Sequence, residues 1–263
     1  VVGMTESIWA ACGRPAQIAF VGGGGKTTLT FRTARDVASE GGIAVVVTTT
    51  RMLLPTTDDV PSVIVQAEFD DARREVEAAI ASGAKTVAVA AGVEDSPHGK
   101  RAIGVPIQWV SGLLGPGLGT VCVVEADGSR KLPFKAPRQP QEPVLPPEIE
   151  VVVAICGLDC LGSALVEKEV CRADIVAQLA GVELGSLVTP AVVGKVMASK
   201  AVWCWNAMHC SFFVAINKVD DRNRLDVTEV VTAVVASADG VQEVFMVGED
   251  VSGRGGLIGR ERA

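Results

Sequence analysis

The sequence lacks the features that mark membrane-spanning, secreted and nucleic-acid-binding proteins. No apolar run in its 263 residues approaches the roughly 20 residues that a helix needs to cross a bilayer. The N-terminus shows no basic segment followed by an apolar stretch, so no secretory signal is expected. The formal net charge of −7 disfavours binding to nucleic acid or to an anionic membrane surface. We therefore expect a cytoplasmic protein with no membrane partner and no nucleic-acid partner.

A disulfide framework is not expected either. The seven cysteines are an odd number in a chain of this size, and some lie in or beside apolar runs, where cysteine behaves as a small hydrophobic residue. Buried thiols are therefore the first expectation. The spacing of Cys156 and Cys160, with Cys171 further on, leaves a role in handling metal or selenium as the alternative, although zinc sites usually show tighter paired clusters.

Apolar strands alternate with helical patterns along the chain, and 48% hydrophobic with 21% charged residues is the composition of a globular protein. Short apolar runs predict strands over Gln17–Val21, Ile43–Val47, Ser62–Gln66, Thr86–Ala90, Thr120–Glu125, Val151–Ile155, Phe212–Ile216 and Val244–Val247. Helical patterns cover Thr27–Glu40, Asp70–Ser82, Val166–Leu179, Pro190–Ser199 and Asp226–Ala236. This order favours an α/β fold with a mostly parallel sheet covered by helices on both faces.

Prolines gather between residues 133 and 147. Proline fixes φ and lacks a backbone N–H, so this stretch cannot form a helix or a central strand. We expect it to be an extended connector.

The strongest motif follows the first predicted strand, where a glycine run leads into a Lys-Thr pair at the start of a helix. This is the order that a phosphate-binding loop requires, because glycines let N–H groups approach a phosphate and the helix N-terminus adds partial positive charge. Lys26 would reach the β- and γ-phosphates and Thr27 would bind Mg²⁺, although Phe20 stands where the strict G-x-x-x-x-G-K-[ST] pattern has glycine. The nucleotide-binding candidates in this loop are Gly22, Gly23, Gly24, Gly25, Lys26, Thr27 and Thr28.

Two acids, Glu125 and Asp127, mark the end of the predicted strand Thr120–Glu125. An apolar strand that ends in acids is the Walker B arrangement, in which a carboxylate holds Mg²⁺, and we favour Asp127 over Glu125 as the metal ligand. Thr50 is a further metal candidate, because ligands gather at the carboxyl ends of parallel strands. Arg130 is expected to stabilise charge on the transferring phosphoryl group, with a plain surface charge as the alternative. Lys26, Asp127 and Arg130 are the catalytic candidates.

The base-specificity motif is Asn217-Lys218-Val219-Asp220, directly after a predicted strand. It matches the N-K-x-D motif of GTPases, in which the aspartate accepts hydrogen bonds from guanine while the asparagine and lysine brace the pocket. Adenine offers no matching donors, so Asp220 would be left unpaired beside ATP. Asn217, Lys218 and Asp220 therefore predict GTP as the nucleotide, with ATP as the alternative.

Together these motifs resemble the YqeC family of selenium-dependent hydroxylase accessory proteins. The matching blocks are Val21–Leu29, Thr48–Pro55, Val124–Pro137, Glu142–Pro146, Gly157–Gly162 and Asn217–Asp220. The resemblance implies a cytoplasmic P-loop protein that takes part in maturing molybdenum hydroxylases with a selenium-dependent centre. It also implies a protein client, either such a hydroxylase or its maturation machinery. The chain departs from the family pattern at Cys171, where a histidine is expected before Arg172.

We therefore expect one P-loop NTPase domain over residues 1–263, with a three-layer fold and the proline-rich connector at 133–147 inside it. The connector has to lie inside the domain because residues 217–220 must meet the glycine loop. The expected function is a Mg²⁺-dependent GTPase that serves as an accessory factor. The alternatives are a small-molecule kinase or nucleotidyltransferase that uses ATP, and a nucleotide-bound interaction module without hydrolysis. A kinase would need a general base, and neither His98 nor His209 has a context that nominates it.

Overall fold

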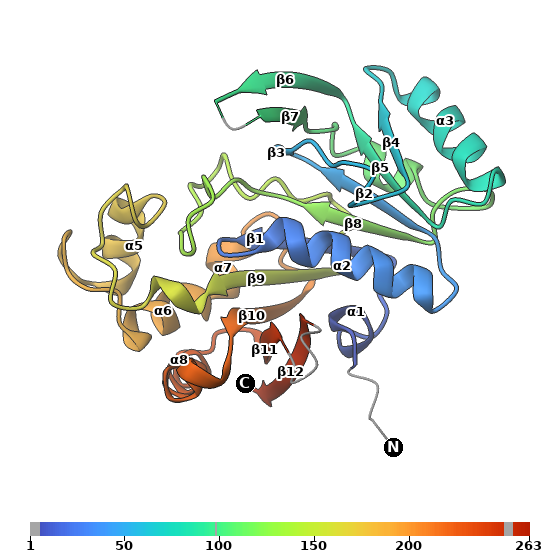
Figure 1. The fold of residues 1–263 in the computed structure, drawn as a ribbon. Coiled ribbons are helices and arrows are strands. Elements are labelled where there is room, and N and C mark those ends of the chain that lie inside the picture. The colour runs from blue at the N-terminus through green and yellow to red at the C-terminus, as the bar shows by residue number, and fades with distance from the viewer. Residues whose placement is uncertain (1–5, 98, 250–254) are drawn as a thin grey trace.

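The centre of the protein is a nine-stranded sheet (Figure 1). The computed structural model describes residues 6–97, 99–249 and 255–263. In spatial order the strands are β12 (Gly255–Arg262), β11 (Val241–Glu249), β10 (Ser211–Val219), β9 (Val151–Gly157), β1 (Gln17–Gly22), β8 (Val121–Glu125), β2 (Ala44–Thr48), β5 (Thr86–Ala90) and β4 (Ser62–Val65). Every neighbouring pair is parallel except β11 and β12. The prediction of an α/β fold with a mostly parallel sheet is therefore confirmed.

The central strands are buried along their whole length. All positions of β1, β2, β5, β8 and β9 are buried, as a parallel sheet covered on both faces requires. β1 lies between β8 and β9, and Ile18 is in register with Val123 on one side and Val151 on the other. The loops that follow β1, β8 and β9 therefore meet at one edge of the sheet.

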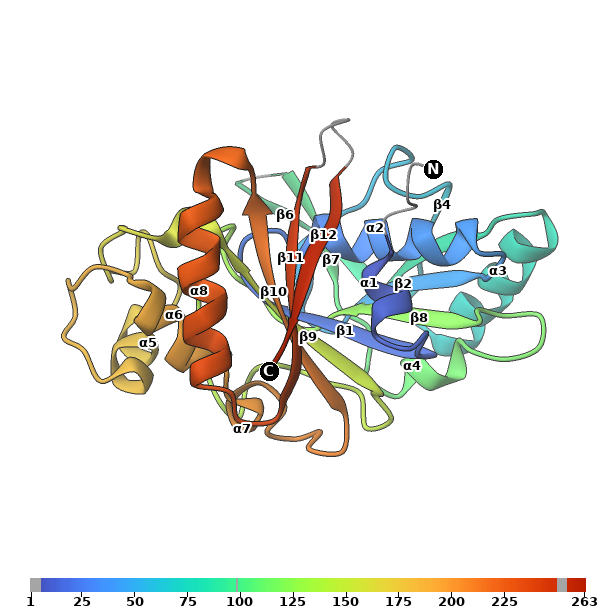
Figure 2. The same cartoon turned by 90° about the horizontal axis from the view of Figure 1, so that it is seen from below.

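Helices pack on both faces of this sheet, because successive side chains of a strand point to opposite sides. Ile18 and Phe20 of β1 share a buried cluster with Leu29 of α2 (Lys26–Ser39). Ala19 and Val21 belong to the cluster on the other face. The helices of that face are α3 (Phe69–Ala81), α5 (Ala173–Ala180), α6 (Pro190–Met197) and α8 (Arg224–Ala236). Figure 2 shows α2 and α8 over different halves of the sheet. The short helices are α1 (Ile8–Ala11), α4 (Trp109–Gly112), α7 (Lys200–Trp203), η1 (Leu158–Cys160) and η2 (Asp221–Asn223).

A second, three-stranded sheet was not predicted. Its antiparallel strands are β3 (Arg51–Leu53), β7 (Gly99–Ile103) and β6 (Gly92–Ser96). β3 follows β2 after two residues and β6 follows β5 after one, so this small sheet grows out of the carboxyl edge of the large one (Figure 1).

The proline-rich segment contains no helix, and its only strand-like feature is an isolated bridge between Lys135 and Cys171. It is tied across the carboxyl edge of the sheet by backbone hydrogen bonds. Gly24 N donates to Leu132 O over 3.1 Å, and Gly157 N donates to Pro133 O over 2.9 Å. The strands that follow it, β9 and β10, join the same sheet beside β1.

The predicted helix over Val166–Leu179 is wrong in its first half. α5 begins only at Ala173, because Arg172 has a left-handed φ of 60° that interrupts any helix at this point. Glu167 provides a cap instead, since its Oε1 accepts a hydrogen bond from Ala173 N over 2.9 Å. The segment before α5 is therefore a set of turns.

Within the described ranges, none of the helices combines the length and the apolar character needed to traverse a bilayer.

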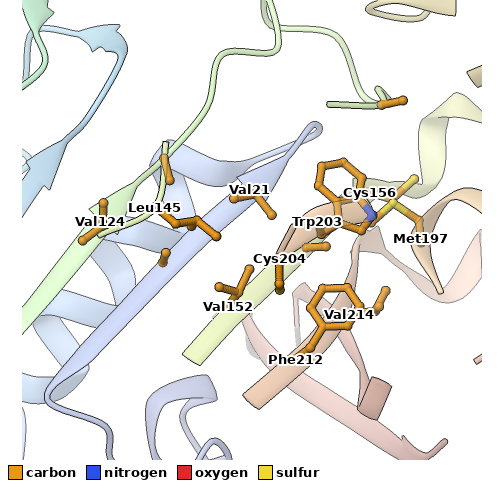
Figure 3. Packing of buried hydrophobic residues seen from close by; sticks show 14 of the residues in the cluster. Val21, Val124, Leu145, Val152, Cys156, Met197, Trp203, Cys204, Phe212 and Val214 are labelled. Atoms are coloured by element: carbon orange, nitrogen blue, oxygen red, sulfur yellow. The ribbon is translucent and has the colours of Figure 1, made fainter. Parts of the chain in front are cut away.

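Among the described residues, Trp203 is the largest side chain that is fully buried. Its Nε1 donates a hydrogen bond to Val196 O over 3.0 Å, so its polar atom is satisfied. Figure 3 shows the indole ring among Cys156, Met197 and Cys204, at the base of the helices that cover the β9 and β10 half of the sheet.

We expect Trp203→Ala to lower the free energy of unfolding by about 3–5 kcal/mol, because it leaves a large cavity and an unpaired carbonyl. Chemical denaturation followed by circular dichroism measures this change. Leu225→Ala is the matched control, since Leu225 is 82% exposed and its loss should change stability by less than about 0.5 kcal/mol. Equal effects of the two substitutions would contradict this description of the core.

Candidate functional site

The glycine loop is shaped by close contacts with its neighbours. Gly24 and Gly25 have φ values of 76° and 126°, and a Cβ at either position would overlap Gly157 or the Asn217 amide. Glycine is therefore required at both positions. Gly23 N donates to Ile155 O over 2.9 Å, so this part of the loop is anchored to β9.

The start of α2 supplies donors that the helix itself does not use. The first N–H groups of any α-helix have no partner within the helix, and they carry partial positive charge. Here they belong to residues of the Lys-Thr-Thr sequence, and Gly25 precedes them as the N-cap without a side-chain hydrogen bond. The anion-binding capacity of the loop therefore lies at the start of α2.

Two clefts meet at this helix. The first, of about 340 Å³, is lined by residues 24–28, Glu125, residues 128–131 and Lys218, and on the side of the small sheet by residues 51–53 and Arg101. The second, of about 400 Å³, is lined by Thr28, Leu29, Arg32, residues 217–220, Arg222, Val247 and Gly248. We call them the loop cleft and the β10 cleft. Thr28 and Lys218 line both, so the two clefts adjoin.

Thr27 and Glu125 face each other in the loop cleft. Thr27 Oγ1 donates a hydrogen bond to Glu125 Oε2 over 2.8 Å, and Glu125 is only 4% exposed. Burial raises the pKa of the Glu125 carboxyl, and the nearby Lys26 and Thr27 offset only part of this effect. A hydroxyl and a carboxylate, both oxygen donors, suit Mg²⁺.

Asp127 lies deeper and does not line the loop cleft. It is fully buried, and its Oδ2 accepts a hydrogen bond from Gly22 N over 2.9 Å and pairs with Lys135 Nζ at 2.8 Å. Its Oδ1 lies 3.3 Å from Lys26 Nζ, a close charge contact that lacks hydrogen-bond geometry. Asp127, the acid that the sequence favoured for the metal, is therefore surrounded by two lysines and an N–H group. Glu125 is the acid that faces the cleft.

Lys26 is 4% exposed and folds back toward its own loop. Its Nζ donates a hydrogen bond to Gly22 O over 2.6 Å, in addition to the contact with Asp127. Lys26 therefore lines the bottom of the loop cleft, held by the carbonyl of a residue four positions earlier in the same loop.

Sequence reasoning missed two residues of this charge network, Lys135 and Glu142. Lys135 is fully buried, and its Nζ also bonds Gly128 O at 2.6 Å and Glu142 Oε2 at 2.8 Å. Arg172 Nη1 lies 2.6 Å from the same Glu142 oxygen. Burial would raise the pKa of Glu142, but the hydrogen bonds from Arg172 and Lys135 outweigh it and hold that pKa below its ordinary value. We call Lys26, Asp127, Lys135, Glu142 and Arg172 the charge chain. Both missed residues lie in the proline-rich segment, where only the family resemblance gave a signal.

The β10 cleft brings the Asn-Lys-x-Asp motif to the glycine loop. Asn217 Nδ2 donates to Gly24 O over 2.8 Å, and Lys218 Nζ bonds Asp159 Oδ2 over 2.6 Å. Asp220 accepts hydrogen bonds from the backbone N–H of Arg222 over 2.8 Å and from its Nε over 3.1 Å. These bonds hold the pKa of the Asp220 carboxyl below its usual range. The motif thus lies beside the loop although 193 residues separate Asn217 from Gly24.

Thr50 and Arg130, the other predicted site residues, lie differently. Thr50 does not line either cleft, and its buried hydroxyl has no hydrogen-bond partner in the part of the chain that the structure describes. Its neighbour Thr48 bonds the carbonyl of Glu125 instead. Arg130 lines the loop cleft and pairs with Glu167 at 3.0 Å.

The cysteines are mostly buried, as expected, with Cys12 half-buried. Cys156 and Cys160 have sulfur atoms 3.6 Å apart, and burial raises the pKa of the Cys156 thiol. Among residues 6–97, 99–249 and 255–263 there is no group of three or more His, Cys, Asp or Glu side chains that could hold a metal ion. His209 is exposed, and His98 lies outside the described residues.

We expect Lys135→Met to destabilise the protein by about 3–5 kcal/mol, because it leaves the Asp127 and Glu142 carboxylates buried with less positive charge nearby. The substitution should also reduce the loss in free energy of unfolding between neutral and acidic pH. The lowered pKa of Glu142 means that its ion pairs stabilise the fold above its ordinary value of 4.5 and are lost as pH falls below it. Urea unfolding at neutral and at acidic pH measures both effects. Lys168→Met, at a lysine that is 79% exposed, is the control and should change neither.

The range that matches known proteins contains all five residues of the charge chain. A model of the YqeC protein family matches residues 18–174, more than half of the chain. The curated relative "Uncharacterized protein YqeC" of Escherichia coli (strain K12) is 30% identical over 168 residues. That alignment covers 64% of this chain, which in turn spans 62% of the length of the relative. No solved structure matches. The matched range contains the glycine loop, both strand-end acids and the residues from Lys135 to Arg172, whereas Asn217 and Asp220 lie outside it. On this match, the chain belongs to the YqeC family.

Proposed function

We propose that this chain is a P-loop NTPase that binds Mg²⁺ and GTP, hydrolyses the nucleotide and serves as an accessory factor in the maturation of a selenium-dependent molybdenum hydroxylase. One observation carries the proposal. The Thr27 hydroxyl and the Glu125 carboxylate meet at 2.8 Å in the cleft that the glycine loop lines. The maturation role comes from the family resemblance.

The triphosphate is assigned to the loop cleft. The unused N–H groups at the start of α2 and its partial positive charge favour phosphate oxygens. Lys26 now binds Gly22 O, and a β- or γ-phosphate would replace that carbonyl, since a lysine ammonium has three donors. Asp127 keeps its contact with Lys26 and acts as a positioning residue for the ammonium group.

Mg²⁺ is assigned to Thr27 and Glu125, which revises the preference for Asp127. The bound cation would supply charge neutralisation between the β- and γ-phosphates. Glu125 is suited to this role because it is buried, faces Thr27 and lines the cleft. Asp127 already pairs with two lysines, Lys26 and Lys135, so its charge is compensated without a metal.

The guanine base is assigned to the β10 cleft. Asp220 carries the required carboxylate, and Arg222, whose side chain is 91% exposed, now occupies it. Guanine N1–H and its exocyclic amine would replace the Arg222 side chain as donors. Adenine has no donors at these positions, so it could not replace the Arg222 side chain and would gain no hydrogen bond from Asp220. The two bases would therefore differ in the hydrogen bonds that they gain in this cleft.

Hydrolysis would draw on Arg130, which lines the loop cleft and could stabilise charge on the γ-phosphate. A slow intrinsic rate is expected, because in GTPases of this kind a protein partner often completes the site. The implied client, a molybdenum hydroxylase or its maturation machinery, would be that partner.

The test is a competition between GTP and ATP for a fluorescent nucleotide, with and without Mg²⁺. Wild type should prefer GTP by at least about tenfold, or about 1.4 kcal/mol. Lys26→Ala should weaken both nucleotides, and Asp220→Ala should erase the preference. Asp221→Ala is the matched control, since this neighbouring acid pairs with Arg224 and lines neither cleft. Equal or tighter binding of ATP by wild type would transfer the proposal to an ATPase or kinase.

A second prediction separates the two strand-end acids. Glu125→Gln keeps an acceptor for Thr27 but removes the carboxylate, so we expect the gain in GTP affinity on adding Mg²⁺ to fall at least tenfold. The nucleotide-free variant should be as stable as wild type or more stable, because a neutral amide costs less to bury than this carboxylate, whose pKa burial has raised. Binding titrations in Mg²⁺ and in EDTA, together with thermal unfolding, measure the two effects. The exposed Glu183→Gln serves as control. A normal Mg²⁺ response in Glu125→Gln would return the metal to Asp127.

A further inference from the structure

The loop cleft extends past the glycine loop into a region lined by four basic side chains. Arg51 comes from β3, Arg101 from β7, and Arg130 and Lys131 from the turn after β8. We call this part the outer cleft. β3 follows β2, and β2 lies on the other side of β1 and β8 from β10 in the strand order. The β3 side of the outer cleft is therefore the side away from the proposed base site, where the γ-phosphate end of the proposed nucleotide would lie.

Among the residues that the structure describes, two of these four side chains form an ion pair with an acid and two do not. Arg51 pairs with Glu94 at 2.7 Å and Arg130 pairs with Glu167 at 3.0 Å. Arg101 and Lys131 form no ion pair with any residue that the structure describes, although Arg101 lies opposite Glu94, the partner of Arg51, in the register of β6 and β7. Arg101 Nε is moreover buried without a hydrogen-bond partner in the described chain. An unsatisfied buried donor on a guanidinium costs free energy that a ligand would recover.

The backbone of the turn is held in an unfavourable conformation. Arg130 and Lys131 are successive left-handed residues with φ of 54° and 64°, and such residues cost of order 1–3 kcal/mol each. The turn is closed by a 2.9 Å hydrogen bond from Leu132 N to Ser129 O, and Leu132 O holds Gly24 N. These hydrogen bonds hold the strained turn, and with it two basic side chains, beside the glycine loop.

We propose that the outer cleft binds the phosphoryl group of a second, small phosphorylated molecule beside the γ-phosphate. This inference rests on the proposed function, which places the nucleotide in the same cleft. Lys26, the start of α2 and the Thr27–Glu125 metal site already serve the triphosphate, so Arg101 and Lys131 remain for another anion. Their two charges match a phosphate dianion, and a guanidinium binds phosphate oxygens through two parallel donors. A hollow of this size in a protein of net charge −7 suits a small molecule and not a nucleic acid.

The experiment titrates inorganic phosphate, as the probe, into the 263-residue chain saturated with Mg²⁺ and a non-hydrolysable GTP analogue. Isothermal calorimetry should detect one site per chain. Arg101→Ala and Lys131→Ala should each weaken phosphate binding at least tenfold while changing the affinity for the GTP analogue less than threefold. Lys100→Ala is the matched control, because Lys100 is the neighbour of Arg101 on β7 but does not line the cleft.

Three outcomes would overturn the proposal. One is the absence of phosphate binding to the nucleotide-loaded protein. Another is equal binding by wild type and both variants. The third is a loss of affinity in the two variants for the GTP analogue but not for GDP, which would assign both cations to the γ-phosphate.

A failure of the proposed function gives a different pattern. If the GTP analogue does not bind, phosphate is titrated into nucleotide-free wild type and Lys26→Ala. Binding that depends on Arg101 and Lys131 but not on Lys26 then supports the outer site on its own. Binding that depends on Lys26 alone places phosphate in the glycine loop and overturns the proposal.

Discussion

The neutralisation of a fully buried carboxylate organises the carboxyl edge of the sheet. Asp127 lies two residues past the end of β8 and has no access to solvent. An ionised acid in such a place is stable only when paired and hydrogen-bonded, and Gly22 N, Lys26 and Lys135 meet that need. Each partner comes from a different segment, namely the end of β1, the start of α2 and the proline-rich connector. The electrostatic requirement of one side chain therefore fixes the relative position of three segments around the glycine loop.

The proline-rich connector, residues 133–147, consequently forms one side of the site. Lys135 and Glu142 continue the charge chain from Asp127 to Arg172, at the N-terminus of α5. Buried ion pairs give little net stability, because desolvation cancels most of the Coulomb attraction. Breaking one of them is costly nevertheless, since it leaves an uncompensated charge. The arrangement therefore favours a single conformation of the connector over the loop, and a shift of Lys26 toward a phosphate would alter the electrostatic balance felt by Lys135.

Local patterns in the sequence were enough to find the elements buried on both faces. β1, β2 and β8 are almost entirely apolar, and a glycine loop follows β1 while an acid ends β8. The sheet of β3, β6 and β7 escaped prediction because its strands are short and partly exposed. The helix predicted before Ala173 is absent, because the left-handed backbone of Arg172 that prevents it leaves no mark in the residue pattern. Lys135 was missed for a further reason. A lysine between prolines resembles a solvated linker residue, and only its distant partner Asp127 reveals that it is buried.

The geometry also gives Glu125 and Asp127 different roles, which the motif pattern alone does not distinguish. Walker-type sequences mark where acids end a strand, but they do not say which acid meets the metal and which one holds the lysine. Successive side chains in an extended chain point to opposite sides, so residues two apart are expected on the same side. Glu125 and Asp127 are two residues apart, yet their side chains face different surroundings. β8 ends at Glu125, so Asp127 lies past the end of the strand and its backbone is free to turn inward. Glu125 thus faces Thr27, whereas Asp127 turns beneath the loop to Gly22 N. The division of labour between the two acids follows from where the strand stops.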